Sequence, residues 1–328
     1  MGARHLVTGA AGLIGFELAR QLLEQGDEVV AVDVGLKGGL GDLDGLAKKH
    51  PKALTTIRGD IARDAKVLDA ARGRYDGIFH LAAIVGVRYV MDHPYETLDV
   101  NLRSTLNVLD LARQEGCGAF VFGSSSENYA SGADAGTVPI PTPEDVTLSI
   151  ADIALPRWSY AASKIAGESA VFAAAREGKF APAVVRFHNV YGPRMGPTHV
   201  IPEFLQRCKQ RADPFPVYGE EQTRSFLYVD DAAEALRLTL RVALNGQSGL
   251  TNIGSSVETR IGDLAALVFD VTGHRPKVDR RPAPPGSVAR RVPDVKKLSS
   301  LGFRPRMSLE QGVRACWAGL VPDFARKG

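Results

Sequence analysis

The chain has 328 residues, of which 45% are apolar and 23% charged, fractions that are ordinary for a globular protein. They exclude a wholly disordered chain and leave enough apolar material for one large α/β domain or two smaller ones. The net charge of +3, from 40 Lys and Arg against 37 Asp and Glu, is no sign of a nucleic-acid-binding protein.

The three cysteines are widely spaced and form no CxxC pair, which argues against a zinc ribbon and against a disulfide framework. The first thirty residues lack the regions of a signal peptide in their usual order, and no apolar run reaches the ~20 residues of a membrane span. We therefore expect a soluble, cytoplasmic protein without a membrane or nucleic-acid partner. No histidine has metal-ligand spacing to another, so we expect no metal site.

The first elements form a recognisable unit. Residues 4–8 are apolar and predict a buried strand, residues 9–15 contain three glycines, and an amphipathic helical pattern then runs to Gly26. Residues 28–32 predict a second strand that ends at Asp33, 18 positions after Gly15.

This order of strand, glycine loop, helix, strand and acid predicts a dinucleotide site. The glycines permit a tight turn and close approach of a pyrophosphate, and the helix N-terminus offers free N–H groups. Asp33 is placed to accept hydrogen bonds from a ribose and would repel a 2′-phosphate, so NAD is favoured over NADP. The glycine spacing is G-x-x-G-x-x-G, and the alternative is a sharp turn without a ligand. The predicted residues of the loop are Gly9, Gly12, Leu13, Ile14 and Gly15.

The middle of the chain continues the alternation of strands and helices. Strands are predicted at residues 55–61, 75–83 and 119–122, and apolar residues at helical spacing run from Leu98 to Leu111. This alternation predicts an α/β fold with a doubly wound parallel sheet. Ligands bind beyond the carboxyl ends of such strands. The polar and small residues expected at that edge are Asp60, Ala82, Ala83 and the run from Ser124 to Glu127.

A proline-containing loop at 130–158, a possible lid, precedes Tyr160 and Lys164. These two residues are i and i+4 and share a helix face. A phenol has a pKa of about 10, and a lysine one turn away together with a cationic nicotinamide ring would lower it. The pair alone is a common surface pattern, but the glycine loop and the serine-rich strand end before it favour a catalytic role.

Taken together, these segments resemble the extended short-chain dehydrogenase/reductase family, specifically its nucleotide-sugar epimerases, dehydratases and decarboxylases. The matching segments span nearly the whole chain in the family's order. They are TGAAGLIG at 8–15, Asp33, GDI at 59–61, HLAA at 80–83, Asn101, SSSE at 124–127, YAASK at 160–164, RFHNVYGPR at 186–194 and RSFLYVDD at 224–231.

The resemblance implies bound NAD and a sugar activated by a nucleoside diphosphate. It makes Tyr160 the base that takes a hydroxyl proton, with Lys164 on the ribose and Ser125 on the same hydroxyl. The implied cofactor contacts are Gly9, Gly12, Leu13, Ile14, Gly15, Asp33, Asp60, Ile61, Leu81, Ala82, Ala83, Asn101, Tyr160, Lys164 and Val190. The implied substrate contacts are Ser124, Asn189, Arg224, and Arg290 or Arg291 as a second cation; for the basic residues near 280–297 a solvated face is the alternative.

Three fates follow a 4-keto sugar in this family: epimerisation, dehydration and decarboxylation. We rank epimerisation first. The triplet Ser125-Ser126-Glu127 keeps the glutamate of the 4,6-dehydratases but not their aspartate, and it approaches the Thr-Ser-Glu of UDP-glucuronate decarboxylases. Glu127 and Ser126 are therefore candidate catalytic residues, and a structural carboxylate is the alternative for Glu127. A protein that binds a dinucleotide without catalysis is a remote alternative.

The expected organisation is interleaved. Residues 1–185 are expected to form the NAD-binding Rossmann domain, with a return contribution from about 225–255, and residues 186–328 the nucleotide-sugar-binding domain. Relatives commonly dimerise through the helices that correspond to about 95–113 and 159–176, so we expect a homodimer.

Overall fold

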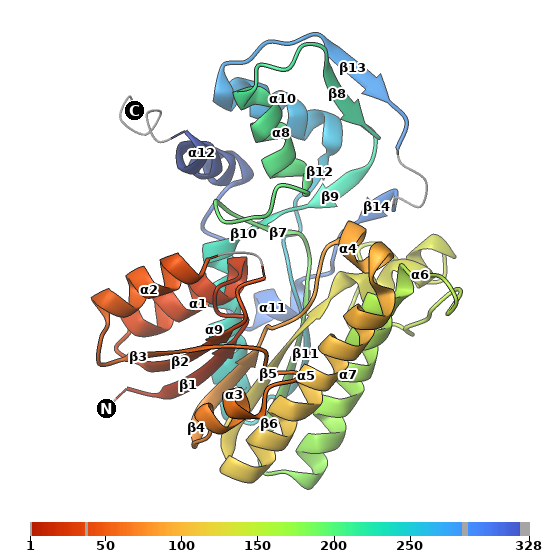
Figure 1. The fold of residues 1–328 in the computed structure, drawn as a ribbon. Coiled ribbons are helices and arrows are strands. Elements are labelled where there is room, and N and C mark those ends of the chain that lie inside the picture. The colour runs from red at the N-terminus through yellow and green to blue at the C-terminus, as the bar shows by residue number, and fades with distance from the viewer. Residues whose placement is uncertain (1, 37–38, 284–287, 322–328) are drawn as a thin grey trace.

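The computed structural model describes residues 2–36, 39–283 and 288–321. A seven-stranded sheet forms its centre (Figure 1), and every neighbouring pair of strands in it is parallel. The predicted doubly wound parallel sheet is confirmed. In spatial order the strands are β11 (Gly249–Ile253), β6 (Ala181–Phe187), β5 (Cys117–Ser125), β4 (Tyr75–His80), β1 (Arg4–Thr8), β2 (Glu28–Asp33) and β3 (Leu54–Arg58).

Both faces of the sheet are covered, because its strands are apolar on both sides. Leu6 and Val7, neighbours on β1, are fully buried in two different cores, as the alternation of side chains along a strand requires. The helices of one face are α1 (Leu13–Glu24), α2 (Leu40–Lys49) and α9 (Val229–Leu244), and those of the other are α3 (Ala65–Ala70), α5 (Pro94–Glu115) and α7 (Trp158–Glu177).

The two longest helices, α5 and α7, lie side by side on the outside of the sheet (Figure 1). Proline at the first position of α5 suits a helix start, since that residue's N–H has no partner within the helix. Both predicted helices are confirmed, with ends a few residues beyond the predicted ones. Three short helices follow strand ends at the carboxyl edge: α4 (Val87–Asp92), the 3-10 helix η1 (Ser126–Tyr129) and α6 (Ala130–Asp134).

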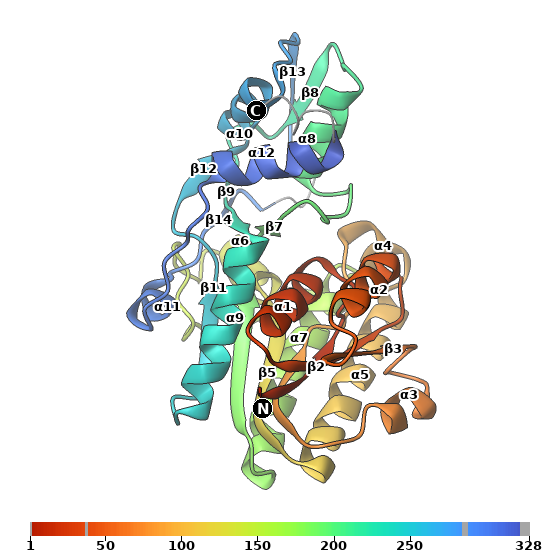
Figure 2. The ribbon, with the colours of Figure 1, turned by 90° about the vertical axis from the view of Figure 1, so that its left-hand side faces the viewer.

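A smaller layer of helices and short strands lies beyond the carboxyl edge of the sheet (Figure 2). Its core includes Phe215, whose ring meets Phe204 and Phe269 edge-to-face at centroid distances of 5.4 and 4.9 Å. Its helices are α8 (Val200–Lys209), α10 (Ile261–Thr272) and α12 (Leu309–Leu320). Its strand pairs are β8 (Phe215–Tyr218) with β13 (Val278–Arg281), and β9 (Thr223–Ser225) with β12 (Glu258–Arg260) and β14 (Arg290–Arg291).

The chain passes between the two layers more than once. After β6, strands β7 (Val190–Tyr191) and β10 (Leu227–Tyr228) pair at the junction, and α9 and β11 return to the sheet. Helix α11 (Lys296–Ser300) packs beside β11. Within the described ranges, no helix is long and apolar enough to cross a membrane.

Candidate active site

The loop between β1 and α1 is closed by glycines. Gly9 has φ +72°, and a Cβ there would lie 2.8 Å from the backbone nitrogen of Ala82; a Cβ on Gly15 would lie 2.2 Å from the Gly9 carbonyl oxygen. Helix α1 begins after Gly12, with no side chain capping its N-terminus and no acidic residue in its first turn. Its backbone N–H groups therefore form an anion site suited to a pyrophosphate.

Asp33 lies beside this loop at the end of β2. Its Oδ2 accepts a hydrogen bond from the backbone N–H of Ala11 at 2.9 Å, and its Oδ1 accepts one from Gly35 at 2.7 Å. These bonds hold the carboxylate at the edge of the glycine loop, where a ribose hydroxyl is recognised in dinucleotide folds. The cradle and the acid fit an NAD molecule.

The other predicted cofactor residues follow neighbouring strand ends. Leu81, Ala82 and Ala83 follow β4 and are partly exposed, whereas Ile61 after β3 and Val190 in β7 are buried. Asp60, also after β3, accepts a hydrogen bond from the backbone N–H of Ala62 at 2.8 Å. Leu13 and Ile14 are the first, partly exposed residues of α1.

Asn101, another predicted cofactor contact, is buried and is hydrogen-bonded to other parts of the protein. Its Oδ1 accepts a hydrogen bond from the Ile84 N–H at 2.7 Å, and its Nδ2 donates to the Ile84 carbonyl at 3.1 Å and to Ser163 Oγ at 3.2 Å. The side chain is buried and ties the loop after β4 to α7. This position does not support the predicted direct contact with the cofactor, because the amide is already bonded within the protein.

Ser125, Tyr160 and Lys164 meet where β5 ends against α7. The Ser125 hydroxyl is hydrogen-bonded to the Tyr160 phenol, and it also accepts the Glu127 N–H at 3.2 Å. Lys164 Nζ donates to the carbonyl oxygen of Gly123 at 2.7 Å and lies 5.9 Å from the centroid of the Tyr160 ring. The structure therefore brings together three of the five side chains predicted to be catalytic.

Burial dominates the electrostatics of this group. It raises the pKa of Tyr160 to about 12; the hydrogen bond with Ser125 acts in the opposite direction, and the charge of Glu127 adds to the rise. Burial also lowers the pKa of Lys164 to about 8, against the charge of Glu168. For Tyr160 to act as a base near neutral pH, a further positive charge must stabilise its phenolate.

Glu127 pairs with an arginine from the other end of the chain. Its Oε1 lies 2.5 Å from Nη1 of Arg291 in β14. The preceding Arg290 is bound instead by both carboxylate oxygens of Glu258, at 2.6 and 2.7 Å. Successive strand residues face opposite sides, so only one of the two arginines reaches Glu127. Of the two arginines predicted as a second cation, Arg291 is the one beside Glu127, whereas Arg290 is paired with Glu258.

Arg224 lies next to Arg291. The two are register partners on the parallel strands β9 and β14. Burial lowers the pKa of Arg224 to about 10, the charge of Arg291 lowers it further, and Glu127 opposes both. Two adjacent, partly buried guanidinium groups are chemically suited to a strongly charged anion such as a diphosphate.

A cavity of about 510 Å³ opens beside Arg224 in the smaller layer. That volume lies within the range of small-molecule sites, about 300–1,000 Å³. Asn189, at the junction of the layers, lines this cavity, and its Nδ2 donates to the Ser225 carbonyl at 3.0 Å. The other lining residues are Val200, Glu203, Phe204, Arg207, Tyr218, Gln222, Phe226 and Ile261. The aromatic and polar lining suits a nucleoside.

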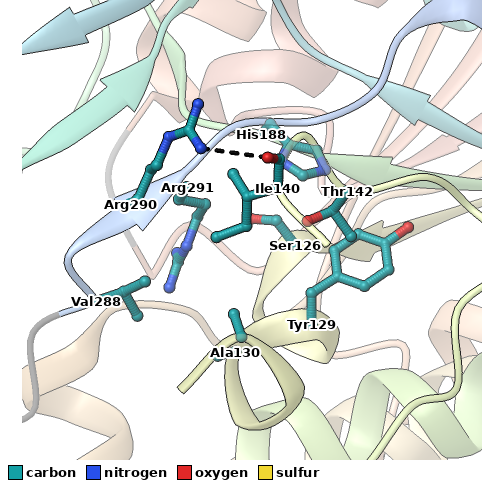
Figure 3. A pocket seen from close by; sticks show the side chains of 10 residues that line it. Ser126, Tyr129, Ala130, Ile140, Thr142, His188, Val288, Arg290 and Arg291 are labelled. Carbon is teal, nitrogen blue, oxygen red and sulfur yellow. Dashed lines mark hydrogen bonds between the residues drawn. The ribbon is translucent and has the colours of Figure 1, made fainter. Parts of the chain in front are cut away.

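Ser126 belongs to a second, much smaller pocket (Figure 3), where it lies with Tyr129, His188, Arg290 and Arg291. Its side chain is buried. Ala130, Ala133, Ile140, Thr142 and Val288 line the rest of this pocket, whose volume of about 10 Å³ has room for about one water molecule.

Ser124 lines neither of these two pockets. Its hydroxyl donates to Oε1 of Glu168 at 2.6 Å and accepts from Nδ2 of Asn128 at 3.1 Å. The predicted contact with the sugar is not supported, because the residue is buried and both interactions are internal. Glu168 and its partner Arg186 were missed by the sequence reasoning. Their signal was present: a glutamate one turn beyond Lys164, and an arginine inside an apolar strand.

Comparison with known proteins is consistent with this geometry. Residues 5–254 match the NAD dependent epimerase/dehydratase family. The chain is 34% identical to a UDP-N-acetyl-alpha-D-glucosaminuronate decarboxylase of Bacillus cytotoxicus, over 96% of both chains. It is 31% identical to a putative UDP-glucose 4-epimerase of Methanocaldococcus jannaschii, over 94% of this chain and 95% of that one. A solved UDP-glucuronic acid 4-epimerase from Bacillus cereus, in complex with UDP-glucuronic acid and NAD, superposes with a TM-score of 0.82 at 25% identity, covering 97% of this chain and 98% of that one.

Proposed function

The chain belongs to the NAD dependent epimerase/dehydratase family, and we propose that it oxidises C4 of a UDP-sugar and completes its cycle by 4-epimerisation. The observation that carries this proposal is a continuous row of functional groups. It runs from Tyr160 and Ser125 through the Glu127–Arg291 ion pair to Arg224 and the large cavity. A nucleotide in the cavity, a diphosphate on the arginines and a sugar at Tyr160 would occupy this row in their covalent order.

In this proposal the two layers of the structure bind different ligands. We propose that residues 1–185, with a return from about 225–255, bind NAD, and that residues 186–328 hold the nucleotide sugar. Gly9, Gly12 and Gly15 would admit the pyrophosphate, and Asp33 would bind the adenosine ribose. Bound NAD supplies the acceptor for the hydride that leaves C4, a positive ring charge beside Tyr160, and the return of the hydride.

Tyr160 takes the proton of the C4 hydroxyl in this proposal. Ser125, hydrogen-bonded to the phenol, holds that hydroxyl in line with it. Lys164 adds positive charge next to the phenolate and donates to a ribose hydroxyl. Asn189 and Arg224 anchor the nucleotide end, so that the sugar is free to present either face of C4. That freedom is what epimerisation requires, because the hydride must return to the opposite face.

Decarboxylation of a UDP-uronate is the second candidate, and the Glu127–Arg291 pair favours it. A 4-ketone makes the loss of a C6 carboxylate as carbon dioxide easier, because the electron pair left at C5 is delocalised into the ketone. Arg291 would bind the C6 carboxylate before it leaves as carbon dioxide. Glu127 would deliver the proton that C5 then takes up. The decarboxylase relative supports this alternative as much as the epimerase relatives support the first.

We also propose that the protein is a homodimer that pairs through α5 and α7. Large apolar side chains are exposed around these helices: Tyr95 is 79% exposed, Ile153 88% and Leu106 46%. Burying them against a second copy would remove them from water. Light scattering after size exclusion should give twice the chain mass, and Leu106→Glu should shift it toward the monomer. A monomeric wild type would contradict the proposal.

The function is tested by incubating the purified protein with UDP-glucose, UDP-N-acetylglucosamine and UDP-glucuronate, with NAD present, and analysing the products by chromatography and mass spectrometry. An isomer of unchanged mass supports epimerisation, and loss of carbon dioxide supports decarboxylation. No product from any of these UDP-sugars, in a protein that binds NAD, would contradict the proposal and favour a binding protein.

A further inference from the structure

A buried carboxylate outside the row of functional groups connects its supporting elements. Glu168 in α7 is 5% exposed. Its Oε1 accepts hydrogen bonds from Ser124 Oγ at 2.6 Å, from Asn128 Nδ2 at 2.8 Å and from Arg186 Nε at 2.8 Å, and its Oε2 accepts one from Arg186 Nη2 at 2.6 Å. One side chain thereby ties α7 to β5, to η1 and to β6.

The place of this carboxylate along α7 relates it to catalysis. Tyr160, Lys164 and Glu168 follow one another at intervals of four residues, so they lie along one face of the helix. On the facing strand, Ser124 immediately precedes Ser125, which is bonded to Tyr160. The hydrogen bond from Ser124 to Glu168 therefore fixes the position of α7 along the direction of β5. The same position determines whether Ser125 lies next to Tyr160.

The carboxylate also sets the charge around Lys164. The groups that face the ammonium are Tyr160 and Glu168 from its own helix, the Phe122 ring at 4.9 Å and the Gly123 carbonyl from β5, and His80 from β4. Burial lowers the pKa of His80 to about 3, so it is neutral. Glu168 is the anionic group that raises the pKa of Lys164 against burial. Arg186 is paired with Glu168, at 2.6 Å between Nη2 and Oε2.

We propose that Glu168 is a positioning residue for the reaction, which aligns Ser125 with Tyr160 and keeps Lys164 protonated. This inference rests on the proposed roles of Tyr160 and Lys164. It differs from a purely structural role for the Glu168–Arg186 pair, since a structural pair would affect the amount of folded protein without changing the titration of a lysine.

The decisive experiment follows Lys164 directly. Full-length protein labelled with ¹³C at lysine Cε is titrated by NMR, with Lys164→Met identifying the signal. In Glu168→Gln we expect Lys164 to lose its proton at least about one pH unit lower than in the wild type, because the opposite charge one helical turn away has been removed. An unchanged titration in folded Glu168→Gln would overturn the proposal.

Activity gives the second readout. With a UDP-sugar that the wild type converts, kcat of Glu168→Gln should fall by about 100-fold, the cost of misplacing reacting groups by about 1 Å, while KM changes much less. Ser124→Ala keeps the charge and the arginine pair, so it should lower kcat by a smaller factor and leave the Lys164 titration unchanged. Glu177→Gln, which breaks the exposed pair with Arg113 on the same helix, is the matched control and should change neither quantity.

Folding is controlled by a second variant. If Glu168→Gln does not fold because Arg186 is left unpaired, the double variant Glu168→Gln/Arg186→Met removes both buried charges, a change that proteins often tolerate. The same lowered Lys164 titration is expected there, and a wild-type value would overturn the proposal. Failure of the proposed function is distinguishable, because a wild type without activity on UDP-sugars leaves the NMR comparison fully interpretable.

Discussion

The Glu127 carboxylate and the Arg291 guanidinium form an ion pair at 2.5 Å although 164 positions separate them in the chain. Glu127 is the second residue of η1, directly after β5, and Arg291 comes from β14 beside Arg224. Both side chains remain partly accessible, 35% and 18% exposed. The pair therefore bridges the groups assigned to the reaction and those assigned to the diphosphate, and it lies where a substrate anion would compete for the arginine.

Glu127→Gln separates the two candidate reactions. If the protein decarboxylates UDP-glucuronate, loss of this acid–base group should lower kcat by about 100-fold, within the usual range for general acid–base catalysis. If the protein only epimerises at C4, the change should stay within about threefold, because Tyr160 carries that proton. Product formation from UDP-glucuronate and from UDP-glucose measures both. Glu258→Gln, which breaks the pair with Arg290, is the control.

Tyr160→Phe removes the proposed base and little else. We expect kcat to fall by at least about 100-fold with NAD still bound, since the phenyl ring keeps the packing and only the hydroxyl is lost. Turnover and the NAD content of the purified protein give the two readouts. Tyr89→Phe, at an exposed residue bonded to Glu96, controls for loss of a phenol. Wild-type turnover by Tyr160→Phe would contradict its assignment.

Gly15→Ala should abolish NAD binding. Its Cβ would lie 2.2 Å from the Gly9 carbonyl, so the loop must shift away from the position that receives the pyrophosphate. Isothermal titration with NAD should show a Kd at least about 100-fold higher, as expected when a preformed phosphate site is lost. Gly41→Ala meets no atom within 4 Å and should bind NAD normally. Equal Kd values for the two variants would contradict the cradle.

Arg224→Met should weaken binding of UDP. Loss of one charge-assisted contact with a diphosphate costs about 1.5–3 kcal/mol, or about 10- to 150-fold in Kd. KM for the UDP-sugar should rise in proportion while kcat changes less. Arg280→Met, which breaks the exposed pair with Glu220, is the matched control. A Kd for UDP unaffected by Arg224→Met would place the diphosphate elsewhere.

Stability should fall steeply in mild acid. Burial lowers the pKa of both His80 and His188 from 6.5 to about 3. As the pH falls below 6.5, these histidines take up protons in the unfolded chain but not in the folded one. Their contribution to the free energy of unfolding is therefore fully present above pH 6.5 and is lost progressively toward pH 3. Each histidine contributes about 1.4 kcal/mol per pH unit in that window.

Urea unfolding at pH 6, 5 and 4 measures this slope. His188→Phe should remove the slope that this one histidine contributes, about 1.4 kcal/mol per pH unit. Asn252 Oδ1 still accepts a hydrogen bond from the Tyr129 hydroxyl at 2.8 Å in that variant. An equal slope in wild type and His188→Phe would contradict the assignment.

Much of the fold was predictable because its signals are local. The glycine loop, the acid at the end of β2 and the four-residue interval from Tyr160 to Lys164 each lie within one strand–helix unit. The order of strands and helices then places them at one edge of a parallel sheet. The strand predicted over 55–61 ends at Arg58, and the one over 75–83 ends at His80, because the residues beyond form turns at that edge.

The remaining features depend on contacts between distant segments. The choice between Arg290 and Arg291 depends on the phase of a two-residue strand, which two adjacent arginines do not reveal. Ser124 and Asn101 were assigned to ligands, but both are bonded inside the protein, to Glu168 and to Ile84 respectively. The polar network around Glu168 joins four elements, and its partners become evident only when those elements are packed.

The central claim, transient oxidation at C4 of a UDP-sugar, is tested most directly with a substrate carrying deuterium at C4. The account predicts slower turnover with the deuterated sugar and a product that retains the deuterium at C4, whether that product is the epimer or the decarboxylated sugar, because the hydride leaves and returns to the same carbon. Loss of the deuterium to water would contradict it. So would equal turnover rates for the deuterated and the ordinary sugar, if found in the wild type and also in Tyr160→Phe.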